Sequence, residues 1–257
     1  MGLRVSVEGR PGVGRRTIEA ALRRRGVQVV PAAPDVRVLV VAEALKPEDV
    51  RDDATVVVQT KADLTDATCG IRVVGLLAVL DRLTDDEVDA LRVLIRHPAD
   101  MTSVDAFVSG AHPLGRDVRQ HLLERLDRFG IAHAVLALAD GADPAAVAAR
   151  LTALSNIDAV LAAVRAASAP VRYRRIAESR CSSEVLDDAA VLDRMSAAVD
   201  VVEAAGVAVD RGDRPQDHRR RALHWARYSR GPVTDLHRAC AADIVRGSLV
   251  LLDGAEP

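Results

Sequence analysis

The sequence predicts an α/β fold with a mostly parallel sheet, to which a C-terminal helical hairpin or bundle is appended. Over the first 80 residues, short runs of Val, Ile and Leu alternate with helical or loop segments, as in parallel sheets whose strands are joined by helices. Beyond residue 169, charged residues interleave with Leu, Val and Ala at helical spacing. We therefore expect an α/β domain over residues 1–168 and an α-helical domain over residues 169–257.

Five aliphatic runs in the first domain are predicted to be strands: 3–7, 27–30, 36–42, 55–59 and 71–74. The run at 36–42 is aliphatic apart from Arg37, which is typical of a central parallel strand buried on both faces. Residues 15–25 have helical spacing, with Ile18, Ala21 and Leu22 on one face. A later run, 132–138, is also predicted to be a strand.

Two sequence signals mark the starts of helices. Thr84 lies three residues before Glu87 and predicts a capping box. Asp143 precedes Pro144, which is the pattern of an N-cap followed by proline in the first turn. The predicted helices after residue 115 are 116–129, 144–154, 157–167, 171–182, 185–205, 215–229 and 233–252.

Composition excludes several classes of protein. The net charge of −2 and the mixed acids and bases argue against a nucleic-acid partner held by charge. No apolar run approaches the roughly 20 residues that span a bilayer, and the N-terminus enters a strand pattern without signal-peptide anatomy. Neither the three cysteines, Cys69, Cys181 and Cys240, nor the seven histidines have metal-ligand spacing. We expect a cytoplasmic protein with no metal site.

The first motif is a glycine-rich loop at residues 9–17, between a predicted strand and a predicted helix. Gly9 and Gly14 have the spacing of the phosphate-binding P-loop, G-x-x-x-x-G-K-[ST]. Together with Gly12, they allow backbone N–H groups to point at a phosphate, and the helix N-terminus adds a favourable dipole. The alternative is a glycine-rich turn that binds no ligand.

The cation chemistry of this loop departs from the P-loop pattern. Arg15 occupies the lysine position and can still pair with phosphate through its planar guanidinium. Arg16 occupies the position of the Ser or Thr that binds magnesium, and arginine cannot coordinate a cation. Thr17 lies one position too late for that role. Glu43, after the strand 36–42, is the remaining candidate for holding Mg²⁺, although a glutamate at that place is more often simply solvated.

The second motif is Thr60-Lys61-Ala62-Asp63, at the end of the strand 55–59. It matches the [N/T]-K-x-D element that recognises guanine. Asp63 would accept hydrogen bonds from guanine N1 and the exocyclic amine, and the Lys61 stem would cover one face of the base. Lys61 is one of two lysines in a chain whose other basic residues are arginine, which favours a functional role over a polar loop.

A third element follows the strand 71–74. Gly75 opens a loop at the place where GTPases contact guanine through the backbone, although the usual Ser-Ala is absent.

The order of these elements resembles P-loop GTPases of the bacterial translation-factor class over residues 1–168. Residues 151–160, Leu-Thr-Ala-Leu-Ser-Asn-Ile-Asp-Ala-Val, are similar to the helix that closes the G domain of dynamin-like proteins and leads into their helical stalk. The resemblance implies a G-domain-like P-loop NTPase fold, with GTP or GDP as the ligand.

The sequence has no place for the switches of that family. Its members use two switch regions between the P-loop helix and the guanine motif to bind magnesium and the γ-phosphate, and one of them carries Asp-x-x-Gly. Here residues 15–59 are largely taken up by a helix and strands, and no Asp-x-x-Gly occurs among them. No catalytic residue is therefore predicted.

Three functions remain open. We expect a pseudoGTPase that binds guanine nucleotide weakly or not at all and acts through protein contacts, as an oligomer or beside a complete GTPase. The first alternative is an active, divergent GTPase with Arg15 on phosphate and Thr17 or Glu43 on the metal. The second is an interaction module that uses the P-loop fold only as a scaffold.

The basic run Arg219-Arg220-Arg221, with Trp225 on the same predicted helix, has two interpretations. It is either a contact face for a partner or for acidic lipid headgroups, or a solvated face with Trp225 packed inward. The second interpretation is favoured.

Overall fold

The computed structural model describes residues 3–49, 51–52, 54–61, 68–179 and 187–254. The chain divides into two compact units, Met1–Ala162 and Ala163–Pro257. The division lies within one long helix and precedes the predicted boundary at residue 168. The first unit is α/β, as predicted, and the described part of the second is helical.

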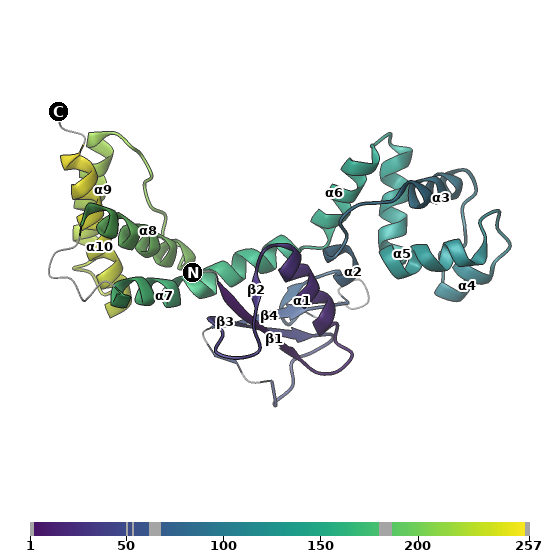
Figure 1. Ribbon diagram of the computed structural model, residues 1–257, viewed down its shortest axis with the longest axis horizontal. Coiled ribbons are helices and arrows are strands. Elements are labelled where there is room, and N and C mark those ends of the chain that lie inside the picture. The colour runs from purple at the N-terminus through teal and green to yellow at the C-terminus, as the bar shows by residue number, and fades with distance from the viewer. Residues whose placement is uncertain (1–2, 50, 53, 62–67, 180–186, 255–257) are drawn as a thin grey trace. The chain divides into compact units, whose positions relative to one another are not determined.

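A five-stranded, all-parallel sheet forms the centre of the first unit, with the strand order β2-β1-β3-β4-β5 (Figure 1). The strands are β1 (Arg4–Gly9), β2 (Gln28–Val29), β3 (Val36–Val41), β4 (Thr55–Gln59) and β5 (Ile71–Arg72). The five strands predicted before residue 75 are therefore confirmed, with β2 and β5 shorter than predicted. Strand β3 is central, and its residues Val38, Val40 and Val41 are fully buried.

The strand order contains a reversal next to β1. Strand β2 lies on one side of β1, and β3, β4 and β5 follow on the other side. In register, Gly9 at the end of β1 pairs with Val40 of β3, and Val41 pairs with Gln59 of β4. The carboxyl ends of these strands therefore lie at one edge of the sheet, where open α/β folds bind ligands at the point of reversal.

In its described residues, the first unit also contains six helices and the start of a seventh: α1 (Arg15–Arg24), α2 (Gly75–Ala78), α3 (Asp85–Arg96), α4 (Val104–Ser109), α5 (Arg116–Ala139), α6 (Pro144–Leu154) and α7 (Ile157–Ser179). Both predicted caps are confirmed. Thr84 and Glu87 form a reciprocal capping box at α3, and the Asp143 carboxylate accepts a hydrogen bond from the N–H of Ala146 at α6.

The predicted strand at 132–138 is wrong, because these residues belong to α5. Ile131, Ala134 and Ala137 are buried at three-residue spacing, which is the pattern of a helix face packed on a core. Helix α5 is broken at Asp127, whose φ of 59° and ψ of 171° are not helical.

Helix α7 also differs from the prediction. The sequence predicts one helix ending before Pro170 and another starting after it, but the structure has a continuous helix with Pro170 inside. Of the helices in the described residues, none alone has the length and apolar character of a membrane span; α6 and α7, bent by 51° at their break, meet the criterion only as a pair.

Helices α2, α3, α4, α5 and α6 enclose a common apolar core. Its large, fully buried side chains include Leu77, Leu91, Phe107, Leu126 and Leu151. Leu77 comes from α2, which directly follows β5, so this core begins at the edge of the sheet where the glycine loop lies.

The second unit contains the rest of α7 together with α8 (Asp188–Ala204), α9 (Pro215–Tyr228) and α10 (Asp235–Asp253). Helix α10 packs against both α8 and α9. Trp225, Cys240 and Ile244 are buried between these helices, and Gly247 of α10 allows Met195 of α8 to lie directly against the backbone.

Candidate functional site

The glycine loop (residues 9–17) connects β1 to α1 by a backbone path that requires glycine. Gly9 has a φ of +151°, and a Cβ atom there would lie 2.5 Å from the carbonyl oxygen of Val40 in β3. Gly14 is the N-cap of α1 and adopts the left-handed conformation, with φ 85°. The loop can therefore lie close to the sheet and turn directly into the helix.

The N-terminus of α1 is open and electropositive. The first N–H groups of a helix have no partner within the helix. Gly14 supplies no capping side chain, and the first turn of α1 contains no acidic residue. Instead it contains Arg15 and Arg16, both exposed. Residues 9–12 and 14–17 line a hollow of about 510 Å³, the phosphate hollow, and these features favour an anion there.

Thr60 holds the glycine loop against the end of β4. Its side chain is buried, and its hydroxyl donates a hydrogen bond to the carbonyl oxygen of Val13 at 2.6 Å. Its backbone N–H donates to the carbonyl oxygen of Val41 in β3 at 2.8 Å. The first residue of the predicted guanine motif therefore fixes the position of the loop.

A second pocket, of about 260 Å³, adjoins the phosphate hollow and shares Gly12, Gly14 and Thr17 with it. We call it the β4–β5 pocket, because most of its other lining residues follow those two strands. Its complete lining is Gly12, Gly14, Thr17, Thr60, Lys61, Val74, Gly75, Leu76 and Asp127.

The two pockets bring together most of the residues that the sequence singles out. Gly9, Arg15 and Arg16 line the phosphate hollow, and Thr60, Lys61 and Gly75 line the β4–β5 pocket. Asp63 lies outside the described residues.

Lys61 has an unusual backbone conformation. Its φ is 54°, in the left-handed region, where a residue with a Cβ atom is disfavoured by roughly 1–2 kcal/mol. Strained residues persist when the surrounding structure fixes them, and they cluster at binding sites. Here Thr60, directly before Lys61, is held by the hydrogen bonds to Val13 and Val41.

Asp127 is the lining residue that sequence reasoning misses. It comes from the break in α5, and its φ of 59° and ψ of 171° fall in a region normally occupied by glycine. That conformation costs about 1–3 kcal/mol in a non-glycine residue. No local pattern predicts it, because the break and the pocket both arise from tertiary packing.

The described residues show no group of three or more His, Cys, Asp or Glu side chains placed to hold a metal ion. Of the two residues considered for Mg²⁺, Thr17 lines both pockets. Glu43 is exposed and lines neither of them. Thr17 is therefore the better placed of the two.

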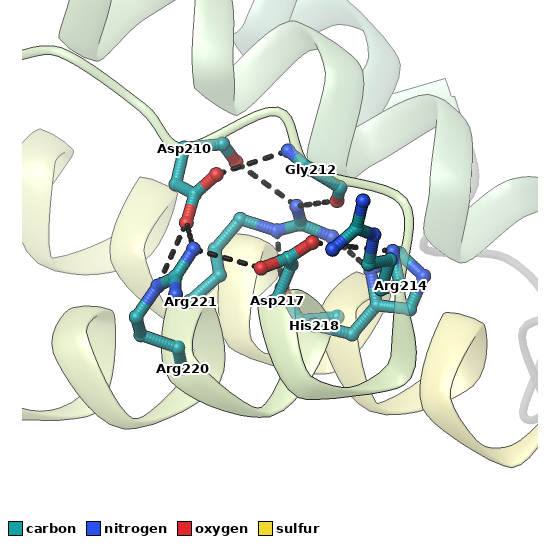
Figure 2. Close-up of polar contacts among 8 residues, drawn as sticks. Asp210, Gly212, Arg214, Asp217, His218, Arg220 and Arg221 are labelled. Atoms are coloured by element: carbon teal, nitrogen blue, oxygen red, sulfur yellow. Dashed lines mark hydrogen bonds and ion pairs between the residues drawn. The ribbon is translucent and has the colours of Figure 1, made fainter.

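Two of the three arginines in the basic run 219–221 bond to other residues of the second unit. Figure 2 shows Arg220 bound to the carboxylates of Asp210 and Asp217, and Arg221 bound to the carbonyl oxygens of Asp210 and Gly212. Arg221 is buried, as is Trp225 on the same helix. Trp225 packs inward, as the favoured interpretation predicts, but that interpretation is wrong in treating the basic run as a solvated face, because Arg221 is buried and bonded to the loop before α9.

A buried polar cluster joins three helices of the second unit. Asp243 of α10 accepts a hydrogen bond from the Tyr173 hydroxyl of α7 at 2.7 Å, and Arg194 of α8 lies 3.4 Å from it. Burial and the bond to Asp243 raise the pKa of Tyr173. Burial, together with the negative charge of Asp243, raises the pKa of the Cys240 thiol to about 12. Cys240 is therefore a protonated core residue and not a nucleophile.

Fold and site together define an α/β chain with a glycine-rich loop at the point of reversal of a parallel sheet. No family model, no curated protein and no solved structure matches the chain.

Proposed function

We propose that the chain is a degenerate P-loop GTPase-like protein, with a reduced G-domain-like first unit that binds GDP or GTP weakly and acts through protein contacts, including contacts with a complete GTPase. The observation that carries the proposal is that two neighbouring hollows share Gly12, Gly14 and Thr17 in their walls. The phosphate hollow contains the glycine loop, and the adjoining β4–β5 pocket contains Lys61.

The charges of the two hollows together suit a nucleotide. The open N-terminus of α1, Arg15 and Arg16 favour phosphates at one end. At the other end, the apolar side chains of Val74 and Leu76 and the stem of Lys61 offer surfaces for a base. The position at the reversal of the strand order is where open α/β sheets bind such ligands.

The same residues argue against efficient hydrolysis. GTP hydrolysis depends on positioned groups around the γ-phosphate and on a bound Mg²⁺. Arg16 stands where the magnesium-binding Ser or Thr is expected, and residues 15–59 contain no Asp-x-x-Gly. A ligand that is bound and not cleaved can act only by stabilising one conformation or one complex, which is why we place the output in protein contacts.

One observation favours an active enzyme as the second candidate. Thr17 lines both pockets, and in this second candidate a small rearrangement turns its hydroxyl to a metal ion beside the phosphates. In that case Thr17→Val abolishes turnover, whereas in a non-hydrolysing protein there is no turnover to lose.

The binding test uses the two lysines of the chain as a matched pair. We expect GDP to bind, to raise the melting temperature, and to stabilise the protein by about 2.7 kcal/mol at 100 times its Kd. Lys61→Ala should weaken binding about fivefold or more. Lys46→Ala removes the same charge at an exposed site outside both pockets and should have no effect.

Two results would contradict the proposal. Equal GDP affinity in Lys61→Ala and Lys46→Ala would remove the β4–β5 pocket from the binding site. Magnesium-dependent GTP turnover above about 1 per minute, well beyond ordinary intrinsic GTPase rates, would show that the hydrolytic machinery is intact.

A further inference from the structure

The break in α5 is fixed in place by its neighbours. On one side of Asp127, Leu126 is fully buried in the core of the first unit. On the other side, the Arg128 guanidinium donates hydrogen bonds to the carbonyl oxygens of Met101 and Thr102, at 3.0 Å and 2.7 Å. Both flanking residues are held, so the unusual backbone of Asp127 between them is determined by the fold.

The break is also anchored to the loop that follows β5. Gly130 approaches α2 so closely that a Cβ atom there would lie 2.8 Å from a methyl carbon of Leu77. Leu77 belongs to the same short helix as Gly75 and Leu76, which line the β4–β5 pocket. The packing of Gly130 on α2 therefore sets Asp127 at the pocket wall.

The backbone at position 127 does not by itself require an aspartate. Its Oδ1 atom accepts a hydrogen bond from the N–H of Arg128, a contact that an asparagine oxygen could also make. Glycine would adopt the same backbone without strain. A carboxylate at this position therefore needs another explanation.

The two hollows differ in their charges. Arg15, Arg16 and the N-terminus of α1 make the phosphate hollow positive. The adjoining pocket contains both the Lys61 ammonium and the Asp127 carboxylate, so its two formal charges cancel and it lacks the positive excess of the phosphate hollow. A carboxylate repels phosphate and accepts hydrogen bonds from N–H and O–H donors, so the two hollows suit the opposite ends of a nucleotide.

We propose that Asp127 is a specificity-determining residue of the β4–β5 pocket, and that its carboxylate accepts hydrogen bonds from donors on the nucleoside part of the ligand, a ribose hydroxyl or an amine of the base. This inference rests on the proposed nucleotide binding and deepens it. It assigns a ligand contact to the break in α5, outside the glycine loop and the Thr60–Lys61 segment.

Two substitutions separate this role from a structural one. Asp127→Gly relieves the backbone strain and should raise the melting temperature of the free protein by about 2–4 °C. It should also weaken GDP binding about tenfold or more, because the charged hydrogen bond is lost. Asp127→Asn keeps the side-chain shape and should likewise weaken binding. Asp117→Asn removes an exposed carboxylate from the same helix and serves as the control.

Ligand analogues identify the donor. If Asp127 binds the ribose, 2′-deoxy-GDP should bind the wild type more weakly than GDP does, and Asp127→Gly, which has no side-chain acceptor, should remove that difference. If it binds the base amine, inosine diphosphate, which lacks the exocyclic amine, should bind the wild type more weakly than GDP does, and Asp127→Gly should remove that difference. Either pattern supports the inference.

Three outcomes overturn it. Unchanged GDP affinity in Asp127→Gly and Asp127→Asn refutes the inference and leaves the proposed function standing. Full discrimination between GDP and both analogues in Asp127→Gly also refutes the inference and leaves the proposed function standing. Failure of the wild-type protein to bind GDP overturns the inference and the proposed function together.

Discussion

Replacement of Thr60 by valine tests how the glycine loop is held. The two side chains have nearly the same shape, but valine lacks the hydroxyl that donates to the carbonyl oxygen of Val13 at 2.6 Å. Because Thr60 is 3 % exposed, water cannot readily replace the lost donor. The carbonyl oxygen of Val41 keeps its hydrogen bond from the backbone N–H of residue 60.

The expected loss follows from this difference. A buried acceptor left without a partner costs about 1–3 kcal/mol. With a urea m-value of about 2 kcal/mol per M, the unfolding midpoint of the first unit should fall by about 0.5–1.5 M. Thr60→Ser retains the hydroxyl and should recover most of the loss.

Far-UV circular dichroism during urea titration measures this change. Trp225 is the single tryptophan and lies in the second unit, so its fluorescence follows that unit separately. Amide hydrogen exchange should also become faster in peptides that cover residues 9–18. An unchanged midpoint together with unchanged exchange in these peptides would refute the role assigned to the Thr60 hydroxyl.

Three further predictions concern groups away from the pocket. Glu87→Gln should destabilise the first unit by about 1–2 kcal/mol at pH 7, because it loses the buried ion pair with Arg125, while the glutamine oxygen can still accept the capping hydrogen bond from the N–H of Thr84. Burial raises the pKa of Glu87, but hydrogen bonds from Arg125 and from a backbone N–H outweigh it and lower the pKa overall. The stability difference between variant and wild type in urea titrations should therefore be full above pH 4.5 and shrink as the pH falls through the lowered pKa. Arg221→Met leaves the carbonyl oxygens before α9 without their donor and should destabilise the second unit by about 3 kcal/mol, as followed by Trp225 fluorescence. The control Arg219→Met, at an exposed site, should change the stability of that unit by less than about 0.5 kcal/mol. With its pKa raised to about 12, Cys240 should resist iodoacetamide at pH 8 until the protein unfolds, as measured by peptide mass spectrometry; rapid labelling in the native state would contradict its burial.

The sheet could be predicted because its signals are local. Strand β3 is aliphatic and buried apart from Arg37, and β4 has the predicted bounds. The caps at Thr84 and Asp143 were equally readable, because a capping side chain and its target N–H are three residues apart.

The errors arise where distant packing decides the local structure. Gly130 suggests the end of a helix, but it lies inside α5 because only glycine fits against Leu77. The real break is at Asp127, where no propensity favours it. Residues 132–138 have the composition of either a strand or a buried helix, and only their packing on the core distinguishes the two.

The same distinction applies to the candidate site. The glycine loop and Lys61 are recognisable because each belongs to a short motif at the end of a strand. Asp127 is far from both in sequence and reaches the pocket through the packing of α5 on α2. A single sequence contains no signal for such a contact.

The central claim is that guanine nucleotide occupies the phosphate hollow and the β4–β5 pocket together. Amide hydrogen exchange with and without saturating GDP, read by mass spectrometry, tests it directly. We predict protection in two segments, residues 9–18 and residues 72–78, with no change in α9 and α10 of the second unit. Protection confined to the second unit, or no protection of either residues 9–18 or residues 72–78 at saturating GDP, would contradict the claim.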